Sequence, residues 1–131
     1  MILLDTHIWV RWLTGEADPL PATIVQQVDA AQTLAVSVIS WWEVAMFVKR
    51  GRLSLPLPLA DWCFEATVNS GIECLPLTPA IALRSVQLAD IHRDPADRFI
   101  MATAIEHQAS LISLDNAIAA YPEMQGILVV A

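Results

Sequence analysis

Five acidic residues stand where apolar segments give way to the starts of helices, and carboxylates in such positions can bind metal ions. Asp5 follows the apolar run "MILL", Glu43 lies in "SWWE", Asp94 and Asp97 bracket Pro-Ala in "HRDPADRF", and Asp115 follows "SLISL". Carboxylate oxygens are the ligands that Mg²⁺ and Mn²⁺ prefer, and the sequence has no Cys/His set with zinc-ligand spacing. If these side chains meet, they predict a site for Mg²⁺ or Mn²⁺.

The same acids have local roles that need no metal. Aspartate is a favoured N-cap and proline suits the first helical turn, so Asp94 is a candidate cap for the helix that follows it. Asp97 then lies in the first turn, where the helix dipole favours an acid. The segment from Ser40 to Glu43 has the S-x-x-E form of a capping box. The remaining two acids can cap helices in the same way, so capping and metal binding both stay open.

Short apolar runs alternate with longer helical segments along the chain, and this alternation is typical of a parallel sheet covered by helices. We expect strands at residues 1–4, 33–39, 72–77, 110–114 and 126–130. We expect helices at residues 6–13, 21–31, 41–50, 59–70, 79–90 and 94–108, and a short one after Asp115. The predicted fold class is α/β with a central parallel sheet.

This arrangement brings the acids to one edge of the sheet. Right-handed crossovers place parallel strands side by side, and sites in such sheets form at the carboxyl ends of the strands. Asp5 and Asp115 directly follow strands, whereas Glu43, Asp94 and Asp97 belong to the starts of helices beside them. A cluster of carboxylates in an apolar setting repels itself unless protons or cations neutralise it. We therefore predict a shared metal site whose side chains also cap helices.

The bulk composition limits the classes of protein that fit. The 131 residues predict one domain, residues 1–131, long enough to bury a sizeable core. A net charge of −7 argues against a nucleic-acid partner unless bound cations offset the acids. No apolar run is long enough to cross a bilayer, and the start of the chain lacks the features of a signal peptide. We expect a cytoplasmic protein without a membrane partner.

Four segments together resemble the acidic motifs of PIN-domain ribonucleases, most of all the VapC-type toxins of bacterial toxin–antitoxin pairs. They are "LLDTHIWV", "ISWWEVA", "HRDPADRFIMATA" and "LISLD". The resemblance implies a three-layer α/β/α sandwich and an acidic pocket formed by Asp5, Glu43, Asp97 and Asp115. It also implies an endoribonuclease that depends on Mg²⁺ or Mn²⁺, forms a homodimer and is silenced by a cognate antitoxin.

We expect these acids to have different roles in hydrolysis of a phosphodiester bond. Asp5, Asp97 and Asp115 are expected to be the most direct metal ligands, with Glu43 binding a second ion or orienting the attacking water. Asp94 is an extra acid that is either a further, outer ligand or only the helix cap. A bound divalent ion lowers the pKa of water and neutralises charge that develops on a phosphate. Whether one ion or two take part stays open.

Several residues beside the acids have more than one interpretation. The hydroxyls of Thr6 and Ser113 can contact a ligand, a water or a phosphate, or simply lie at a helix start and a strand end. A solvent-facing position is favoured for His7 over a substrate contact, and His92 is expected to be solvated surface. Arg98, next to Asp97, is a candidate to touch phosphate or to pair with a neighbouring acid.

Trp41 and Trp42 are adjacent in a predicted helix and belong to a set of five tryptophans. Adjacent residues on a helix point about 100° apart, so both rings can hardly face the same core. One of the two is therefore a candidate for a dimer or antitoxin surface. Burial in a partner would also account for a mean hydropathy of +0.52.

Three other classes of protein fit the sequence less well. A haloacid-dehalogenase-type phosphatase needs Asp-x-Asp after its first strand, and this chain has Asp5-Thr6-His7. A response-regulator receiver needs a lysine after a late strand, and Lys49, the only lysine, lies in a predicted helix. A non-enzymatic dimerising or partner-binding module with a degenerate acidic pocket is the main alternative, and the complete set of four acids argues against it.

Overall fold

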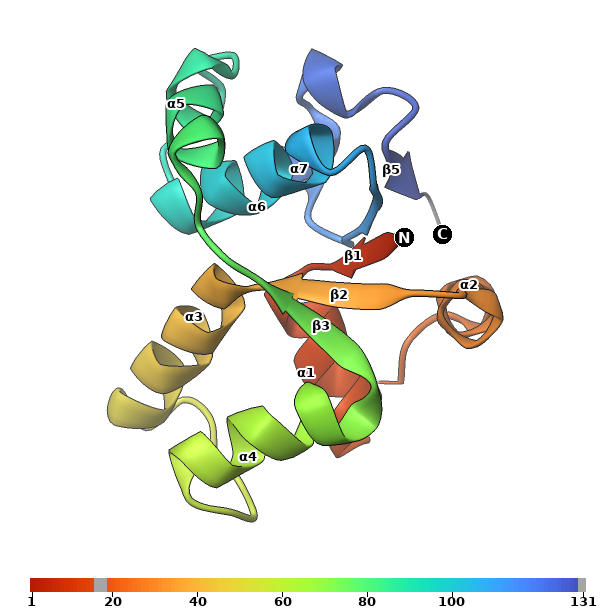
Figure 1. Cartoon of the computed structure of the whole chain (residues 1–131), viewed down its shortest axis with the longest axis vertical. Helices are drawn as coiled ribbons and strands as arrows, with labels where there is room; N and C mark the ends of the chain where they lie inside the picture. The colour runs from red at the N-terminus through yellow and green to blue at the C-terminus, as the bar shows by residue number, and fades with distance from the viewer. Residues whose placement is uncertain (16–18, 130–131) are drawn as a thin grey trace.

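Five short parallel strands form the sheet at the centre of the fold (Figure 1). The computed structural model describes residues 1–15 and 19–129. The strands lie in the order β3-β2-β1-β4-β5, and every neighbouring pair is parallel. They are β1 (Ile2–Leu4), β2 (Leu34–Ser37), β3 (Ile72–Leu75), β4 (Ser110–Ile112) and β5 (Leu128–Val129). The strand that leads to Asp5 therefore occupies the middle of the sheet.

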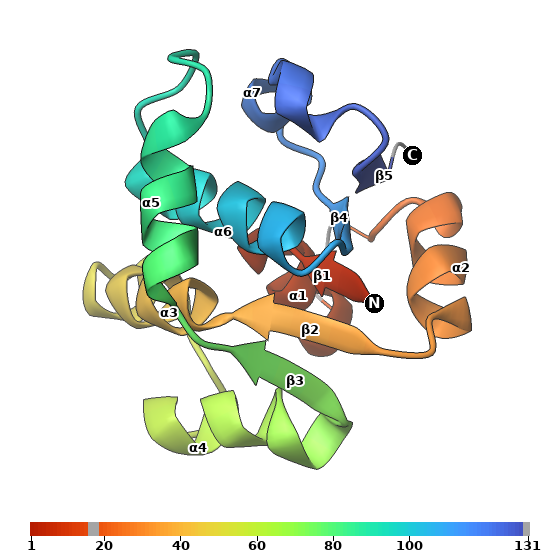
Figure 2. The same cartoon turned by 45° about the horizontal axis from the view of Figure 1, so that its top comes forward.

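Helices cover both faces of this sheet, as Figure 1 and Figure 2 show from two directions. One core packs α1 to α4 against the sheet, and the other packs α6 and α7 against it, with α5 alongside α6. The helices are α1 (Thr6–Thr14), α2 (Ala22–Ala30), α3 (Val38–Lys49), α4 (Leu59–Glu65), α5 (Pro79–Gln87), α6 (Pro95–Glu106) and α7 (Asn116–Ala119), and two 3₁₀ turns cover Val68–Ser70 and Pro122–Met124. Within the described ranges, none is long and apolar enough to span a membrane.

Side chains along each central strand alternate between the two cores. Leu4 and Ile112 belong to the core on the side of α1 to α4, whereas Leu3 and Leu111 belong to the core on the side of α6 and α7. All four are fully buried. A strand buried on both faces has no polar side to show, which explains the continuous apolar runs in the sequence. The predicted three-layer α/β/α sandwich with a central parallel sheet is confirmed.

The boundary after β2 differs from the expected one. The β-branched run predicted a strand to residue 39, but β2 ends at Ser37 and α3 begins at Val38. The Ser37 hydroxyl accepts a hydrogen bond from the backbone N–H of Ile39 (3.0 Å), so Ser37 caps the helix. The expected capping box of Ser40 and Glu43 is therefore wrong, because both residues lie inside α3.

Other predicted elements are shorter than expected at their carboxyl ends. The helix expected at residues 59–70 ends at Glu65, and a 3₁₀ turn follows it that closes at Gly71 with φ of 71°. The helix expected to reach residue 90 ends at Gln87, and the strand expected to reach residue 114 ends at Ile112. Val130, at the end of the last expected strand, lies outside the described residues.

Candidate active site

Asp5 lies at the carboxyl end of β1 and is almost completely buried. Its Oδ1 atom accepts a hydrogen bond from the backbone N–H of Thr6 (2.8 Å) and so caps α1. Its Oδ2 atom accepts a hydrogen bond from the hydroxyl of Ser113 (2.7 Å), one residue beyond the end of β4. Asp5 therefore caps its own helix and links the ends of two neighbouring strands.

Glu43 reaches the site from α3 and is held by a hydroxyl group on α1. The Thr6 hydroxyl donates a hydrogen bond to Glu43 Oε1 (2.6 Å) and also lies 2.8 Å from the Ser40 hydroxyl. Because Thr6 has a single hydroxyl proton, Ser40 is the donor in the second contact. Thr6 and Ser40 are both buried. These two hydroxyls fix the Glu43 carboxylate beside the residue that follows Asp5.

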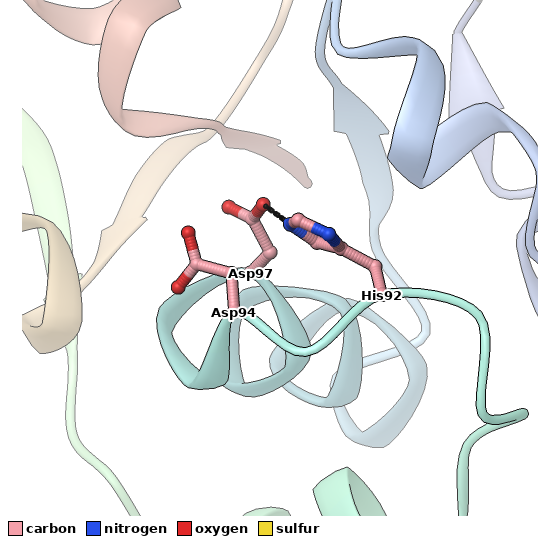
Figure 3. A group of neighbouring side chains, drawn as sticks. All are labelled: His92, Asp94 and Asp97. Carbon is pink, nitrogen blue, oxygen red and sulfur yellow. Dashed lines mark hydrogen bonds and ion pairs between the residues drawn. The ribbon is translucent and has the colours of Figure 1, made fainter.

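The first turn of α6 carries two acids with different surroundings (Figure 3). Asp94 Oδ1 accepts a hydrogen bond from the backbone N–H of Ala96 (3.0 Å), which confirms the predicted cap. Asp97 is buried, and its Oδ2 atom lies 3.0 Å from Nε2 of His92 in the loop before the helix. The two carboxylates and the imidazole gather at the same end of the helix.

Asp115 completes the group from the segment after β4. Its Oδ1 atom accepts a hydrogen bond from the backbone N–H of Ala117 (2.9 Å), so it caps α7. The Ser113 hydroxyl accepts a hydrogen bond from the backbone N–H of Asp115 (3.1 Å) while it donates to Asp5. Ser113 therefore couples the positions of these two acids, which the sequence offered only as one of several roles.

All of the predicted acids act on the protonation of Asp97. Its pKa is raised to about 8, first by burial and then by the negative charges of Asp5, Asp94, Glu43 and Asp115. Because the charges of four other carboxylates act on Asp97, these five acids form a single cluster. The predicted convergence of acids at one edge of the sheet is therefore present in the structure.

The second carboxyl group with a raised pKa is that of Glu43. Burial raises this pKa to about 7, the hydrogen bond from Thr6 opposes the rise, and the charges of Asp5 and Asp94 add to it. A carboxyl group with a pKa close to neutrality can both accept and release a proton near pH 7. Glu43 therefore combines a fixed position with a proton affinity suited to acid–base chemistry.

The sequence matches the PIN domain family over residues 2–124. The chain belongs to the PIN-domain family. It is 34% identical over 116 residues to Ribonuclease VapC22 of Mycobacterium tuberculosis, a match that covers 88% of this chain and 87% of that protein. The match spans nearly the whole of both proteins, so this PIN domain and that ribonuclease correspond along their length.

Solved structures share this fold, and one of them is a toxin–antitoxin complex. A toxin–antitoxin complex from Klebsiella pneumoniae matches with a TM-score of 0.67 and 24% identity, over 99% of this chain and 97% of that one. VapBC2 from Rickettsia felis, bound to a DNA fragment from its promoter, matches with a TM-score of 0.69 and 18% identity over 98% of each chain. At these identities the likeness establishes the PIN fold.

The donor atoms of this PIN domain fit a divalent cation, which PIN-domain nucleases generally use. His92, Asp94 and Asp97 each present one ligand atom, and these atoms lie within 4.8 Å of one another. A cation among the carboxylates would offset the negative charges that raise the pKa of Asp97. The assignment of individual acids as metal ligands or catalytic groups stays a prediction.

The structure corrects the interpretation of His92 and adds two polar contacts to that of His7. His92 was expected to be solvated surface, but its ring is partly buried against Asp97. The His7 ring is 38% exposed, yet its Nδ1 lies 3.3 Å from Asp5 Oδ2, and its Nε2 accepts a hydrogen bond from the backbone N–H of Leu114 (3.2 Å). One feature of the sequence could have pointed to this role of His92. It lies two residues before Asp94, the cap of α6, and from there its side chain can fold back over the first turn of that helix.

The Arg98 guanidinium group forms hydrogen bonds mainly with backbone carbonyl oxygens. It donates hydrogen bonds to the Tyr121 hydroxyl, to the carbonyl oxygen of Ser85 in α5, and to carbonyl oxygens of the loop before α6, at Leu88, Ala89 and His92. The predicted pairing of Arg98 with a neighbouring acid is therefore wrong, whereas the contact with a phosphate stays a prediction. Arg98 instead fixes the loop that places His92 beside Asp97.

The adjacent tryptophans lie in different environments, as their spacing on the helix predicts. Trp42 is 54% exposed. Trp41 is partly buried and packs edge to face against Phe64, with ring centroids 5.5 Å apart. Trp42 is therefore the member of the pair that presents an apolar surface, and its use by a partner stays a prediction.

Proposed function

We propose that this PIN domain is a divalent-metal-dependent endoribonuclease and the toxin of a toxin–antitoxin pair. The family match and the 34% identity to Ribonuclease VapC22 support this activity. The observation that carries the proposal is the acidic cluster around Asp97, whose pKa is raised by burial and then by the charges of four other carboxylates. Such a cluster favours the binding of divalent cations. The phosphodiester bonds of RNA are the proposed substrate.

Asp5, Asp97 and Asp115 are the proposed direct ligands for Mg²⁺ or Mn²⁺. Asp94 is a further acid of the cluster, and Glu43 is held beside it by Thr6. When bound, such an ion lowers the pKa of water and offsets negative charge on the phosphate group. The chain itself fixes the ligands before any ion arrives, because Ser113 holds Asp5 and each of the proposed ligands is anchored at a helix start.

Glu43 is the proposed proton acceptor for the attacking water. Its pKa of about 7 matches this task near neutral pH. The Thr6 hydroxyl bonds Oε1, so Oε2 is the oxygen proposed to accept the proton. Ser40 in turn fixes the Thr6 hydroxyl. The hydroxyls therefore hold Glu43 in one orientation, which favours a defined line of attack on the phosphate.

Cleavage of end-labelled total RNA tests the proposal directly. The purified chain is incubated with Mg²⁺, Mn²⁺ or EDTA, alongside Asp5→Asn and the control Asp29→Asn, an exposed aspartate on α2. Asp5→Asn is expected to lower the cleavage rate by about 10³-fold or more, because it removes a charge that a bound cation needs. The control is expected to cleave like the wild type.

Discrete metal-dependent bands that disappear with Asp5→Asn would support an endoribonuclease. Equal cleavage by Asp5→Asn and the wild type would show that the acidic site is assigned wrongly. A wild-type protein that cleaves no RNA with either metal would instead favour a DNA substrate, or the non-enzymatic binding module with a degenerate acidic pocket.

Removing the Thr6 hydroxyl is expected to move the pH profile of cleavage upward. Thr6→Val deletes the hydrogen bond that stabilises the Glu43 carboxylate, so the pKa of Glu43 rises further. The acidic limb of kcat/KM against pH should shift upward by about 0.5 to 1 unit. Thr103→Val is the control, because this buried hydroxyl donates to the carbonyl of Phe99 within α6. Identical profiles for the two variants would contradict the role given to Thr6.

An antitoxin protein and a second copy of this chain are the proposed partners. The antitoxin proposal is supported by the similar structure from Klebsiella pneumoniae, which is a toxin–antitoxin complex. Trp42 borders two cavities of about 370 and 420 Å³ whose walls are largely apolar, and an antitoxin segment that covers them would remove this apolar surface from water. Homodimerisation and a cytoplasmic location stay predictions.

A further inference from the structure

His92 is placed at the acidic cluster by a loop whose backbone is held by several hydrogen bonds. The backbone N–H of His92 donates to the Tyr121 hydroxyl (2.8 Å), and that hydroxyl donates back to the carbonyl of His92 (2.9 Å). Arg98 donates to the same carbonyl (3.3 Å). The backbone of His92 is therefore held from two sides, and its ring projects from a fixed point toward Asp97 (Figure 3).

The Nε2 atom of His92 is the one that faces the cluster. It lies 3.0 Å from Asp97 Oδ2, and a ligand atom of Asp94 lies within 4.8 Å of both. Two neighbouring ligand atoms on one octahedral ion, each about 2.1 Å from it, are about 3.0 Å apart. The spacing that suits a hydrogen bond here therefore also suits two donors of a single cation.

The Nε2 lone pair of His92 is available for such a contact. Within residues 1–15 and 19–129, no protein group bonds Nδ1 of His92, so the ring proton can reside there. His7 differs, because its Nε2 already accepts the backbone N–H of Leu114 and its proton therefore lies on Nδ1, facing Asp5. Of the two histidines at the cluster, only His92 can turn a lone pair toward a cation without losing a hydrogen bond from the backbone.

We propose that His92 is a direct nitrogen ligand of the divalent cation and that it shifts the preference of the site from Mg²⁺ toward Mn²⁺. This inference rests on one part of the proposed function, namely that the acidic cluster binds a divalent cation. Mg²⁺ favours an all-oxygen set, whereas transition ions accept imidazole nitrogen more readily. His92 would add a nitrogen ligand to the oxygen ligands of Asp94 and Asp97, whereas the acidic residues alone would supply only oxygen.

Mn²⁺ bound to the purified protein, without RNA, reports this ligand directly. Electron spin-echo spectroscopy of the Mn²⁺-loaded wild type is expected to show nitrogen coupling from a bound imidazole. His92→Gln is expected to lose the coupling and to bind Mn²⁺ about tenfold more weakly, with less than about a threefold change for Mg²⁺. His7→Gln, the matched control, is expected to keep the coupling. Urea unfolding of both variants checks that each is folded.

Nitrogen coupling that is absent from the wild type, or that persists in His92→Gln, would overturn the proposal. In the first case His92 serves only to orient Asp97 through a hydrogen bond. Failure of the wild type to bind Mn²⁺ would also overturn it. RNA cleavage is measured separately, so a protein that shows the coupling but cleaves no RNA would leave the ligand assigned and reject the proposed activity.

Discussion

Replacing Asp97 with asparagine is expected to lower RNA cleavage by about 10³-fold or more while making the metal-free protein more stable at pH 8. Asp97 is buried at the start of α6, and its pKa is raised to about 8 by burial and by the charges of four other acids. Asparagine has nearly the same volume and no charge. The substitution therefore removes a proposed metal ligand and relieves repulsion at the same time.

The direction of the stability change follows from the raised pKa. An unperturbed aspartate has a pKa of 3.8, whereas the Asp97 carboxyl group has a pKa of about 8 in the folded protein. Between these values the folded state holds a proton that the unfolded chain has lost, so the free energy of unfolding falls as the pH rises. This loss is complete above pH 8 and absent below pH 4, and Asp97→Asn does not undergo it.

Urea unfolding in EDTA, in steps from pH 5 to pH 8, measures this difference. The wild type is expected to lose stability across the series, and Asp97→Asn to exceed it at pH 8 by on the order of 1–2 kcal/mol after solvent screening. Mn²⁺ should stabilise the wild type more than the variant. Asp29→Asn, the exposed control, is expected to follow the wild type. A variant less stable than the wild type at pH 8 would contradict the repulsion described for the cluster.

Replacing Arg98 with alanine is expected to destabilise the protein by about 3 kcal/mol. Its guanidinium group is the shared donor for a carbonyl oxygen of α5, for carbonyl oxygens of the loop before α6 and for the Tyr121 hydroxyl. Alanine leaves these acceptors without their donor, and a buried acceptor without a donor is costly. Because the carbonyl of His92 is among them, the loop that places His92 at the cluster should also loosen.

Arg84 provides the matched control on the neighbouring helix. Its Nε atom pairs with Glu106 Oε1 at 2.8 Å, but 43% of the Arg84 side chain is exposed. Exposed ion pairs contribute little, so Arg84→Ala is expected to cost less than about 1 kcal/mol. Urea unfolding near pH 7 compares the two variants. Equal losses of stability would contradict the structural role given to Arg98.

Local chemistry was sufficient to predict much of this fold. Asp94 caps α6 as its place before Pro95 indicates, because capping depends only on atoms within a few residues. The central strands are apolar on both faces, and that pattern indicated a covered parallel sheet. The parallel sheet in turn predicted that Asp5 and Asp115 would lie at one edge.

The start of α3 was predicted too late because strand propensity and helix capping favour different boundaries at residues 37–39. Val38 and Ile39 are β-branched and extended the predicted strand, whereas the Ser37 hydroxyl caps a helix that starts at Val38. The earlier start moves Ser40 into the helix, where it meets Thr6 instead of capping. Propensity is a weak preference, and the capping hydrogen bond together with packing against the sheet overrides it.

The sequence by itself therefore determined the order of elements, the layers of the sandwich and the edge at which the acids gather, since these follow from periodicity, capping and the geometry of parallel strands. Only the tertiary structure decided the contacts within the site. The Thr6–Glu43 bond joins residues 37 positions apart, and the Ser113–Asp5 bond joins residues 108 positions apart. Such pairs depend on how helices pack and on which rotamers the packing allows, and no local pattern encodes either.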